Sequence, residues 1–272
     1  MQKFSASPRE LAASLWRNRG LINASVKREV VGRYRGSFMG ILWSFFNPLF
    51  MLTVYTFVFS IIFKARWGVG SDSKTEFALI LFAGLMVFSL FSECIIRAPG
   101  LIVGNPNYVK KVLFPLEILP WVNLGSALFH FSVSMVVWLI AYLCFFGWPN
   151  ITMLYLPLVL LPLVFLIMGI SWALASLGVF LRDVSQFIGI LTTTLMFLSP
   201  VFYPVTAIPE QYRSFIYMNP LTPVIESVRG ILYWGVAPDF GILGIYIVVS
   251  VLFAWLGFFW FQKTRKGFAD VL

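Results

Sequence analysis

The sequence predicts an all-α integral membrane protein, and composition carries that prediction. Hydrophobic residues make up 60% of the 272 residues and charged residues only 11%, and the mean hydropathy is +0.88. A soluble domain carries about 25% charged residues, because its surface must stay hydrated. This composition argues against an ordinary soluble enzyme, a disordered chain and a nucleic-acid-binding module.

Six apolar stretches are long enough to be considered as membrane-spanning helices, which need about 20 residues each. They are Phe38–Phe63, Phe77–Arg97, Leu116–Phe146, Leu154–Leu181, Phe187–Tyr203 and Ile242–Gln262. The fifth stretch is short, because Pro200 and Pro204 interrupt its end. An even number of spans predicts that both ends of the chain lie on the same side of the membrane.

The basic residues are distributed unevenly between the two sides of this arrangement. With the N-terminus inside, 15 of the 20 lysines and arginines fall on the inner side and 5 on the outer side. Basic residues concentrate on the cytoplasmic side of membrane proteins. The pattern therefore predicts cytoplasmic termini, and it explains most of the formal charge of +9 without a nucleic-acid partner.

Residues 1–37 precede the first span and are interpreted as a cytosolic amphipathic interface segment. Ser7, Pro8 and Glu10 form a helix-start pattern with Ser7 as the cap. Apolar residues then recur at near-helical spacing among basic ones, which favours a helix on the membrane surface. Gly20 is expected to break or bend this helix. A solvated basic arm is the alternative, and no cleavable signal peptide is visible in this segment.

The sequence contains no G-x-x-x-x-G-K-[S/T] phosphate loop and no G-x-S-x-G elbow. We therefore expect no catalytic residue, cofactor or metal site on this chain. The centres of the spans hold almost no ionisable groups, which argues against an ion-coupled carrier. Cys94 and Cys144 are interpreted as packing residues. His130 is interpreted as a neutral, hydrogen-bonded packing residue, because no carboxylate lies near it in the sequence.

The pattern R-Y-R-G-S-x-x-G-x-x-W-S-x-x-N-P runs from Arg33 to Pro48. This block resembles the first membrane helix of permease subunits of bacterial polysaccharide exporters of the type-two ATP-binding-cassette class. Three further blocks resemble the same family in the same order along the chain. They are NPNYVKKVLFPLEILP at Asn105–Pro120, FLRDVSQ at Phe180–Gln186 and LSPVFYPVTAIPEQYRSFIYMNPLTPVIESVRG at Leu198–Gly230.

The resemblance implies one half of a transporter in the bacterial inner membrane. Two copies of the chain would form the pore, and two copies of a separate ATPase would bind ATP and magnesium. The substrate would be a lipid-linked polysaccharide, with O-antigen as the first candidate. Teichoic acid, capsule and a small lipid or drug are alternatives within this permease class. A membrane enzyme acting on lipid-linked sugars and a secondary carrier remain as rival classes.

The inner loop at residues 98–115 is expected to couple the permease to the ATPase. Glycine and proline residues bracket a short segment there, which can move as a rigid unit, and the resemblance implies that it is the coupling helix. The coupling residues expected in this loop and in the next inner loop are Asn105, Asn107, Tyr108, Lys110, Lys111, Arg182 and Asp183. The alternatives are anionic-lipid binding by the two lysines and a simple charged stop at the next inner loop.

Aromatic residues make up 18% of the chain, and one set of them shares a helix face. Trp43, Phe46, Phe50 and Phe57 are spaced at three, four and seven residues in the first span. Aromatic rings can stack on the apolar faces of sugars, so this face is expected to line a channel. The resemblance adds the fifth-span residues Phe187, Phe197 and Phe202. For each residue alone, lipid or core packing is the alternative.

The outer segment at residues 204–241 is too apolar for an ordinary loop. It is interpreted as a pair of short re-entrant helices near an outer gate, with gate residues at Tyr203, Pro220, Glu226 and Arg229. Glu226 and Arg229 are three residues apart and can form an ion pair that locks this pair of helices. The permease domain is therefore expected at residues 38–262, followed by a short cytosolic tail at residues 263–272.

Overall fold

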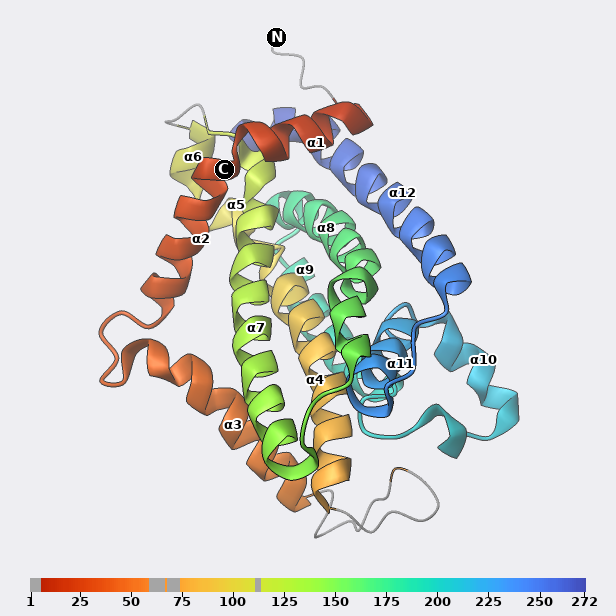
Figure 1. The fold of residues 1–272 in the computed structure, drawn as a ribbon. Helices are drawn as coiled ribbons and strands as arrows, with labels where there is room; N and C mark the ends of the chain where they lie inside the picture. The colour runs from red at the N-terminus through yellow and green to blue at the C-terminus, as the bar shows by residue number, and fades with distance from the viewer. Residues whose placement is uncertain (1–5, 59–66, 68–73, 111–113) are drawn as a thin grey trace.

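The computed structural model describes residues 6–58, 67, 74–110 and 114–272. All regular structure in these ranges is helical, and they contain no strand. Within the described residues, five helical stretches are long and apolar enough to cross a membrane, and Figure 1 shows their arrangement. They are Gly40–Val58, Thr75–Arg97, Leu116–Phe146, Ile151–Phe180 and Phe240–Val271. They match five of the six predicted spans.

The fifth predicted span is shorter than the others in the structure. It corresponds to α9 (Val184–Leu198), which has 15 residues. The helix ends there because Ser199 adopts an extended conformation before Pro200, and a residue that precedes proline disfavours the helical region. The sequence predicts six spans, and the described residues contain five long apolar helices and one short apolar helix.

The long helices surround α4 (Lys74–Arg97), whose apolar residues are almost all buried. It packs against α7 (Leu119–Phe146), α8 (Leu156–Phe180), α9 and α11 (Thr222–Arg229). α8 packs along α12 (Phe240–Thr264), which forms one flank of the bundle in Figure 1. α3 (Trp43–Tyr55) extends from the opposite flank and contacts mainly α7.

Short helices complete both ends of the bundle. At one end lie α5 (Gly100–Val103), α6 (Pro106–Lys110) and α13 (Phe268–Val271), close to both termini (Figure 1). Toward the other end lie α10 (Glu210–Met218) and α11, followed by the π-helical turn Gly230–Trp234. The 3-10 turns are Gly40–Leu42, Leu116–Ile118, Ile151–Tyr155, Val205–Ala207 and Arg265–Gly267.

The N-terminal segment forms two helices, α1 (Pro8–Arg17) and α2 (Arg19–Arg33). The predicted start of the first helix is confirmed, because the Ser7 side chain accepts a hydrogen bond from the backbone N–H of Glu10. The predicted break at Gly20 is wrong by two residues. The chain turns at Asn18, whose φ and ψ are non-helical, and Gly20 lies inside the first turn of α2.

Candidate functional site

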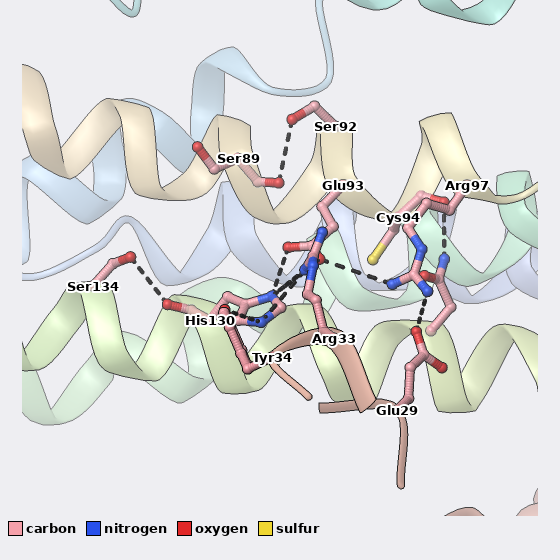
Figure 2. A network of polar contacts seen from close by, with 11 residues as sticks. Glu29, Arg33, Tyr34, Ser89, Ser92, Glu93, Cys94, Arg97, His130 and Ser134 are labelled. Atoms are coloured by element: carbon pink, nitrogen blue, oxygen red, sulfur yellow. Dashed lines mark hydrogen bonds and ion pairs between the residues drawn. The ribbon is translucent and has the colours of Figure 1, made fainter. Parts of the chain in front are cut away.

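Three helices bring a cluster of ionisable side chains together around Glu93. The two carboxylate oxygens of Glu93, on α4, both lie 3.0 Å from Nδ1 of His130, on α7. Arg33, at the end of α2, donates a hydrogen bond to the same carboxylate (Figure 2). The cluster therefore joins α2, α4 and α7 through one partly buried carboxylate.

The cluster continues on both sides of Glu93. The hydroxyl oxygen of Tyr34 lies 3.2 Å from Nε2 of His130, and burial raises the pKa of this phenol, so Tyr34 stays protonated at neutral pH. On the other side, Nη1 of Arg97 lies 3.9 Å from Glu93, and Arg97 also pairs with Glu29 on α2 (Figure 2). Two guanidinium–carboxylate pairs thus fasten α2 to α4.

The structure corrects two predictions from the sequence. His130 was expected to lack a carboxylate partner, but the packing of α4 against α7 places Glu93 beside it. The two residues are 37 positions apart, so only tertiary structure could pair them. Cys144 was interpreted as a packing residue, but in this chain it is exposed near the end of α7, whereas Cys94 is buried. A glutamate and a histidine inside apolar spans were the sequence signal for the cluster.

A cavity of about 540 Å³ opens beside this cluster, between α3, α4 and α7. Its wall combines charged and hydroxyl-bearing side chains with aromatic rings. Its polar and aromatic lining residues are Arg33, Tyr34, Trp43, Ser44, Asn47, Tyr55, Phe82, Phe88, Ser89, Ser92, Glu93, His130 and Ser134. The cavity therefore offers hydrogen-bond donors, acceptors and ring faces at one place.

The aromatic residues predicted to line a channel on the first span all lie on the exposed part of α3 or just beyond it. Trp43, Phe46, Phe50 and Phe57 are each between 40% and 66% exposed. A shallow hollow of about 480 Å³ runs along this face of the helix. In this single chain the first span thus presents an open aromatic surface.

The three fifth-span aromatics differ from one another. Phe187 and Phe197 are exposed on α9. Phe202 follows α9 and is half-buried, with its ring centre 5.8 Å from that of Phe197 and 6.2 Å from that of Tyr55 on α3. Phe202 therefore connects the end of α9 to α3, and its ring is less open than the other two.

Four of the predicted coupling residues, Asn105, Asn107, Tyr108 and Lys110, lie on or beside α6, at the end of the bundle that holds the termini. Tyr108 stacks on Phe114 with ring centres 4.2 Å apart, and its hydroxyl accepts a hydrogen bond of 3.0 Å from Arg28 on α2. Lys110 donates to the backbone oxygen of Leu272. The short helix is thus joined to α2 and to the C-terminal segment.

The remaining predicted coupling residues are less constrained. The Asn105 side chain donates to the backbone oxygen of Leu101 at 2.9 Å, and Asn107 is exposed. Lys111 lies outside the described residues. Arg182 and Asp183 are exposed in the turn between α8 and α9, some distance along the chain from α6.

The outer segment is organised by Arg229, whose side chain is fully buried. Its guanidinium pairs with Glu226 at 2.9 Å and lies over the ring of Trp67, 4.2 Å from the ring centre. It also donates to the backbone oxygens of Ile80, Pro200 and Val201. These contacts tie α11 to α4 and to the chain after α9.

The two other predicted gate residues make backbone-linked contacts. The Tyr203 hydroxyl donates to the backbone oxygen of Phe197 at 2.8 Å. The backbone oxygen of Pro220 accepts from the Tyr246 hydroxyl on α12 at 2.5 Å. Tyr203 thus braces the end of α9, and Pro220 fixes the turn between α10 and α11 against α12.

Comparison with known families identifies the architecture. Residues 20–233 match the ABC-2 type transporter membrane family. The chain belongs to this family. It is accordingly a membrane permease subunit of an ABC-2 exporter, and the match runs from α2 through the cavity, α6 and α9 to the outer helices.

Individual relatives align over most of the chain. The O-antigen export system permease protein RfbA of Myxococcus xanthus is 29% identical over 96% of this chain and 98% of that protein. The polysialic acid transport protein KpsM of Escherichia coli is 26% identical over 76% and 79%. The capsule polysaccharide export inner-membrane protein CtrC of Neisseria meningitidis serogroup B is 27% identical over 79% and 80%.

Proposed function

We propose that this chain is the membrane half of an ATP-driven exporter that moves a lipid-linked polysaccharide, in the first place O-antigen, across the bacterial inner membrane. The observation that carries the proposal is the near full-length similarity to O-antigen export permeases. Two copies of the chain would form the pore. Two copies of a separate ATPase would bind ATP and magnesium and supply the energy.

The exposure of α3 supports the pairing of two copies. Ser44 is the one buried residue among those described in α3, although the helix carries the Asn47 amide as well as the aromatic face. A polar side chain in a membrane helix normally faces protein or a wet cavity. A second copy that faces α3 would enclose this surface and create an aromatic-lined path.

The membrane arrangement that we propose has six spans, with α9 as the fifth. Its 15 residues rise by about 22 Å, less than the hydrocarbon thickness of about 30 Å. The segment after it would complete the crossing, and α10 with α11 would form the re-entrant pair. Both termini would then be cytoplasmic, and their position at one end of the bundle supports this arrangement (Figure 1).

The exposed position of α6 supports a contact with an ATPase. This five-residue helix has no fully buried residue, and it lies at the end of the bundle that holds the termini (Figure 1). A short, exposed helix that is joined to α2 through Tyr108 and Arg28 can pass a displacement to the helix before the first span. Arg182 and Asp183 would extend the contact.

The first experiment is purification from native membranes in mild detergent, with identification of every co-purifying chain. We expect a stoichiometric ATPase that carries a phosphate loop. Its absence, under conditions that preserve other membrane complexes, would contradict the exporter proposal. Deletion of the chain should then remove polysaccharide from the cell surface while lipid-linked polymer accumulates inside. A cell that makes no polymer at all would instead indicate a membrane enzyme.

Capsule export is the second candidate, because capsule and polysialic acid permeases align with most of the chain. The same deletion separates the two, since the missing surface polymer is either O-antigen on lipopolysaccharide or a capsule. Teichoic acid, or a small lipid or drug, would be a further cargo within the same permease class.

A further inference from the structure

The cavity between α3, α4 and α7 interrupts an otherwise buried helix. Along α4 the residues before and after Ser89 are buried, but Ser89 is exposed, and Ser92 and Glu93 are partly exposed. These positions lie three to four residues apart and therefore share one face of the helix. Because all three line the cavity, the polar face of α4 opens into it and not toward the packed core.

Several polar groups in this cavity are available to a ligand. The Asn47 amide and the Ser89 hydroxyl form no hydrogen bond with another side chain or backbone group in the part of the chain that the structure describes. The hydroxyls of Ser92 and Ser134 donate to backbone oxygens but keep free acceptor capacity. Polar groups near the membrane interior are costly and face a water-filled cavity or a substrate.

The charge of the cavity favours a neutral ligand over an anion. Arg33 is paired with Glu93, and the other nearby guanidinium, Arg97, is paired with Glu29. A phosphate group in this cavity would meet the Glu93 carboxylate, and like charges in close contact repel. Neutral hydroxyl groups can instead accept from a guanidinium or an amide and donate to a carboxylate.

Aromatic rings complete a surface that suits a sugar ring. Trp43 and Tyr55 on α3 and Phe88 on α4 line the same cavity, and Trp43 also lines the hollow on the outer face of α3. The volume of about 540 Å³ lies in the range of small-molecule sites, about 300–1,000 Å³. The cavity is therefore large enough for one or two sugar units.

We propose that this cavity is a binding site for a neutral sugar unit of the transported polymer, separate from the open aromatic face of α3. Asn47, Ser89 and Glu93 would bind the sugar hydroxyls, and Trp43 would stack on the ring. The proposal rests on the proposed function as a polysaccharide permease. It adds a site that holds the sugar by hydrogen bonds as well as by stacking.

The test is direct binding to the purified permease, together with any ATPase that co-purifies. Saturation-transfer NMR would use methyl glycosides of common neutral hexoses, 6-deoxyhexoses and N-acetylhexosamines. Ser89→Ala removes the hydroxyl without adding bulk, and Asn47→Leu replaces the amide by an apolar group of similar shape. We expect either change to weaken glycoside binding about three- to tenfold, the usual effect of losing one hydrogen bond. The matched control is Ser132→Ala on α7, whose exposed hydroxyl donates to the backbone oxygen of Leu128 and does not line the cavity.

Three outcomes would overturn the proposal. One is equal glycoside binding by the wild type, the two cavity variants and the control. The second is displacement of the glycosides by inorganic pyrophosphate, which would indicate an anion site. The third is absence of glycoside binding to a permease that restores surface polymer in a deletion strain. That complementation separates the two proposals, because the exporter function can hold while the sugar site fails.

Discussion

Arg229 shows at the scale of one residue how the outer segment is held. Its buried guanidinium serves four acceptors, the Glu226 carboxylate and three backbone oxygens. Buried charges are costly unless they are paired and hydrogen-bonded. The neighbouring Gly84 leaves the necessary space, because a Cβ atom there would lie 2.5 Å from Nη2 of Arg229.

We expect Arg229→Ala to destabilise the permease by about 3–5 kcal/mol, because it leaves Glu226 and three buried carbonyls without their donor. Arg229→Lys should cost less, since an ammonium keeps the charge but lacks the planar fork. The measurement is the thermal unfolding midpoint of the detergent-purified protein, followed by tryptophan fluorescence. Arg17→Ala is the control, because Arg17 forms an exposed pair with Glu10 that contributes at most about 1 kcal/mol. Equal midpoints for the Arg229 and Arg17 variants would contradict this account.

Close helix packing decides the stability of the flank formed by α8 and α12. A Cβ atom at Gly257 on α12 would lie 2.1 Å from the backbone oxygen of Gly169 on α8. The two backbones approach this closely only because both positions are glycine. Small residues are common where membrane helices approach closely, since dispersion and close packing replace the hydrophobic effect inside a bilayer.

Gly257→Ala should therefore destabilise the fold by about 1–3 kcal/mol, the range for overpacking a filled interface. Gly189→Ala on α9 is the matched control, because no atom lies within 4 Å of a Cβ built there. That substitution should be neutral or stabilising by up to about 1 kcal/mol through helix propensity. Unfolding midpoints of both variants test the pair. If the two alanines shift the midpoint equally, steric contact at Gly257 is not the cause.

The aromatic face of α3 is expected to contact the polymer during transport. Replacing Phe46 and Phe50 together by leucine should reduce polymer export about fivefold or more. By analogy with nucleic-acid bases, stacking on an aromatic ring contributes about 1–3 kcal/mol. Surface polymer in a complemented deletion strain is the readout, with assembly checked by co-purification. Phe145→Leu, at an exposed site on α7, should leave export unchanged. Unimpaired export by the double variant would mean that this face packs and does not line a pore.

The coupling segment at residues 98–115 can be tested by reversing its charge. Lys110→Glu combined with Lys111→Glu should prevent the ATPase from driving export while the chain still inserts in the membrane, because the charge of α6 and the following residue is reversed. Membrane content by immunoblot and surface polymer together measure this. Lys266→Glu, on the same side of the molecule, serves as the control for charge alone. Normal export by the double variant would argue that the lysines only favour the cytoplasmic side.

At the scale of the whole molecule, the single chain is open along α3 and closed elsewhere around α4. The buried core contains α4, α8 and parts of α7 and α11, whereas the first span contributes almost nothing to it. A helix left this exposed needs either lipid or a second copy against it. The polar Asn47 and the aromatic face favour the second copy.

Cross-linking tests this arrangement. A cysteine in place of Phe50, in a Cys144→Ser background, should form copy-to-copy products with a short thiol cross-linker in native membranes. Cys94 is buried and should not react. Val249 on α12 is also exposed, 55% against 66% for Phe50, but Val249→Cys should give no such product, because that flank is expected to face lipid. Cross-linking at Val249 but not at Phe50 would contradict the proposal, because the two copies would then meet along α12 and not along α3.

Hydrophobic runs and local signals sufficed to predict the helical class, most spans and the start of α1. The spacing of Glu226 and Arg229 also predicted their ion pair, because residues three apart on a helix meet whatever surrounds them. The helix break predicted at Gly20 lies at Asn18 instead. Asn18 has non-helical backbone angles, whereas Gly20 is part of α2. The C-terminal end of the fifth span is set by Ser199 and Pro200, because Ser199 is extended before the proline.

By itself, the sequence determined the membrane class and the helical elements, because burial in lipid imposes long apolar helices on any chain. Its ordered motifs also indicated the permease family. Only tertiary structure decided that Glu93 meets His130 and Arg33, that Arg229 binds three carbonyls from two other segments, and that a polar cavity lies behind α3. These contacts join residues from 28 to 149 positions apart, and hydrophobic periodicity carries no information about which helix packs against which.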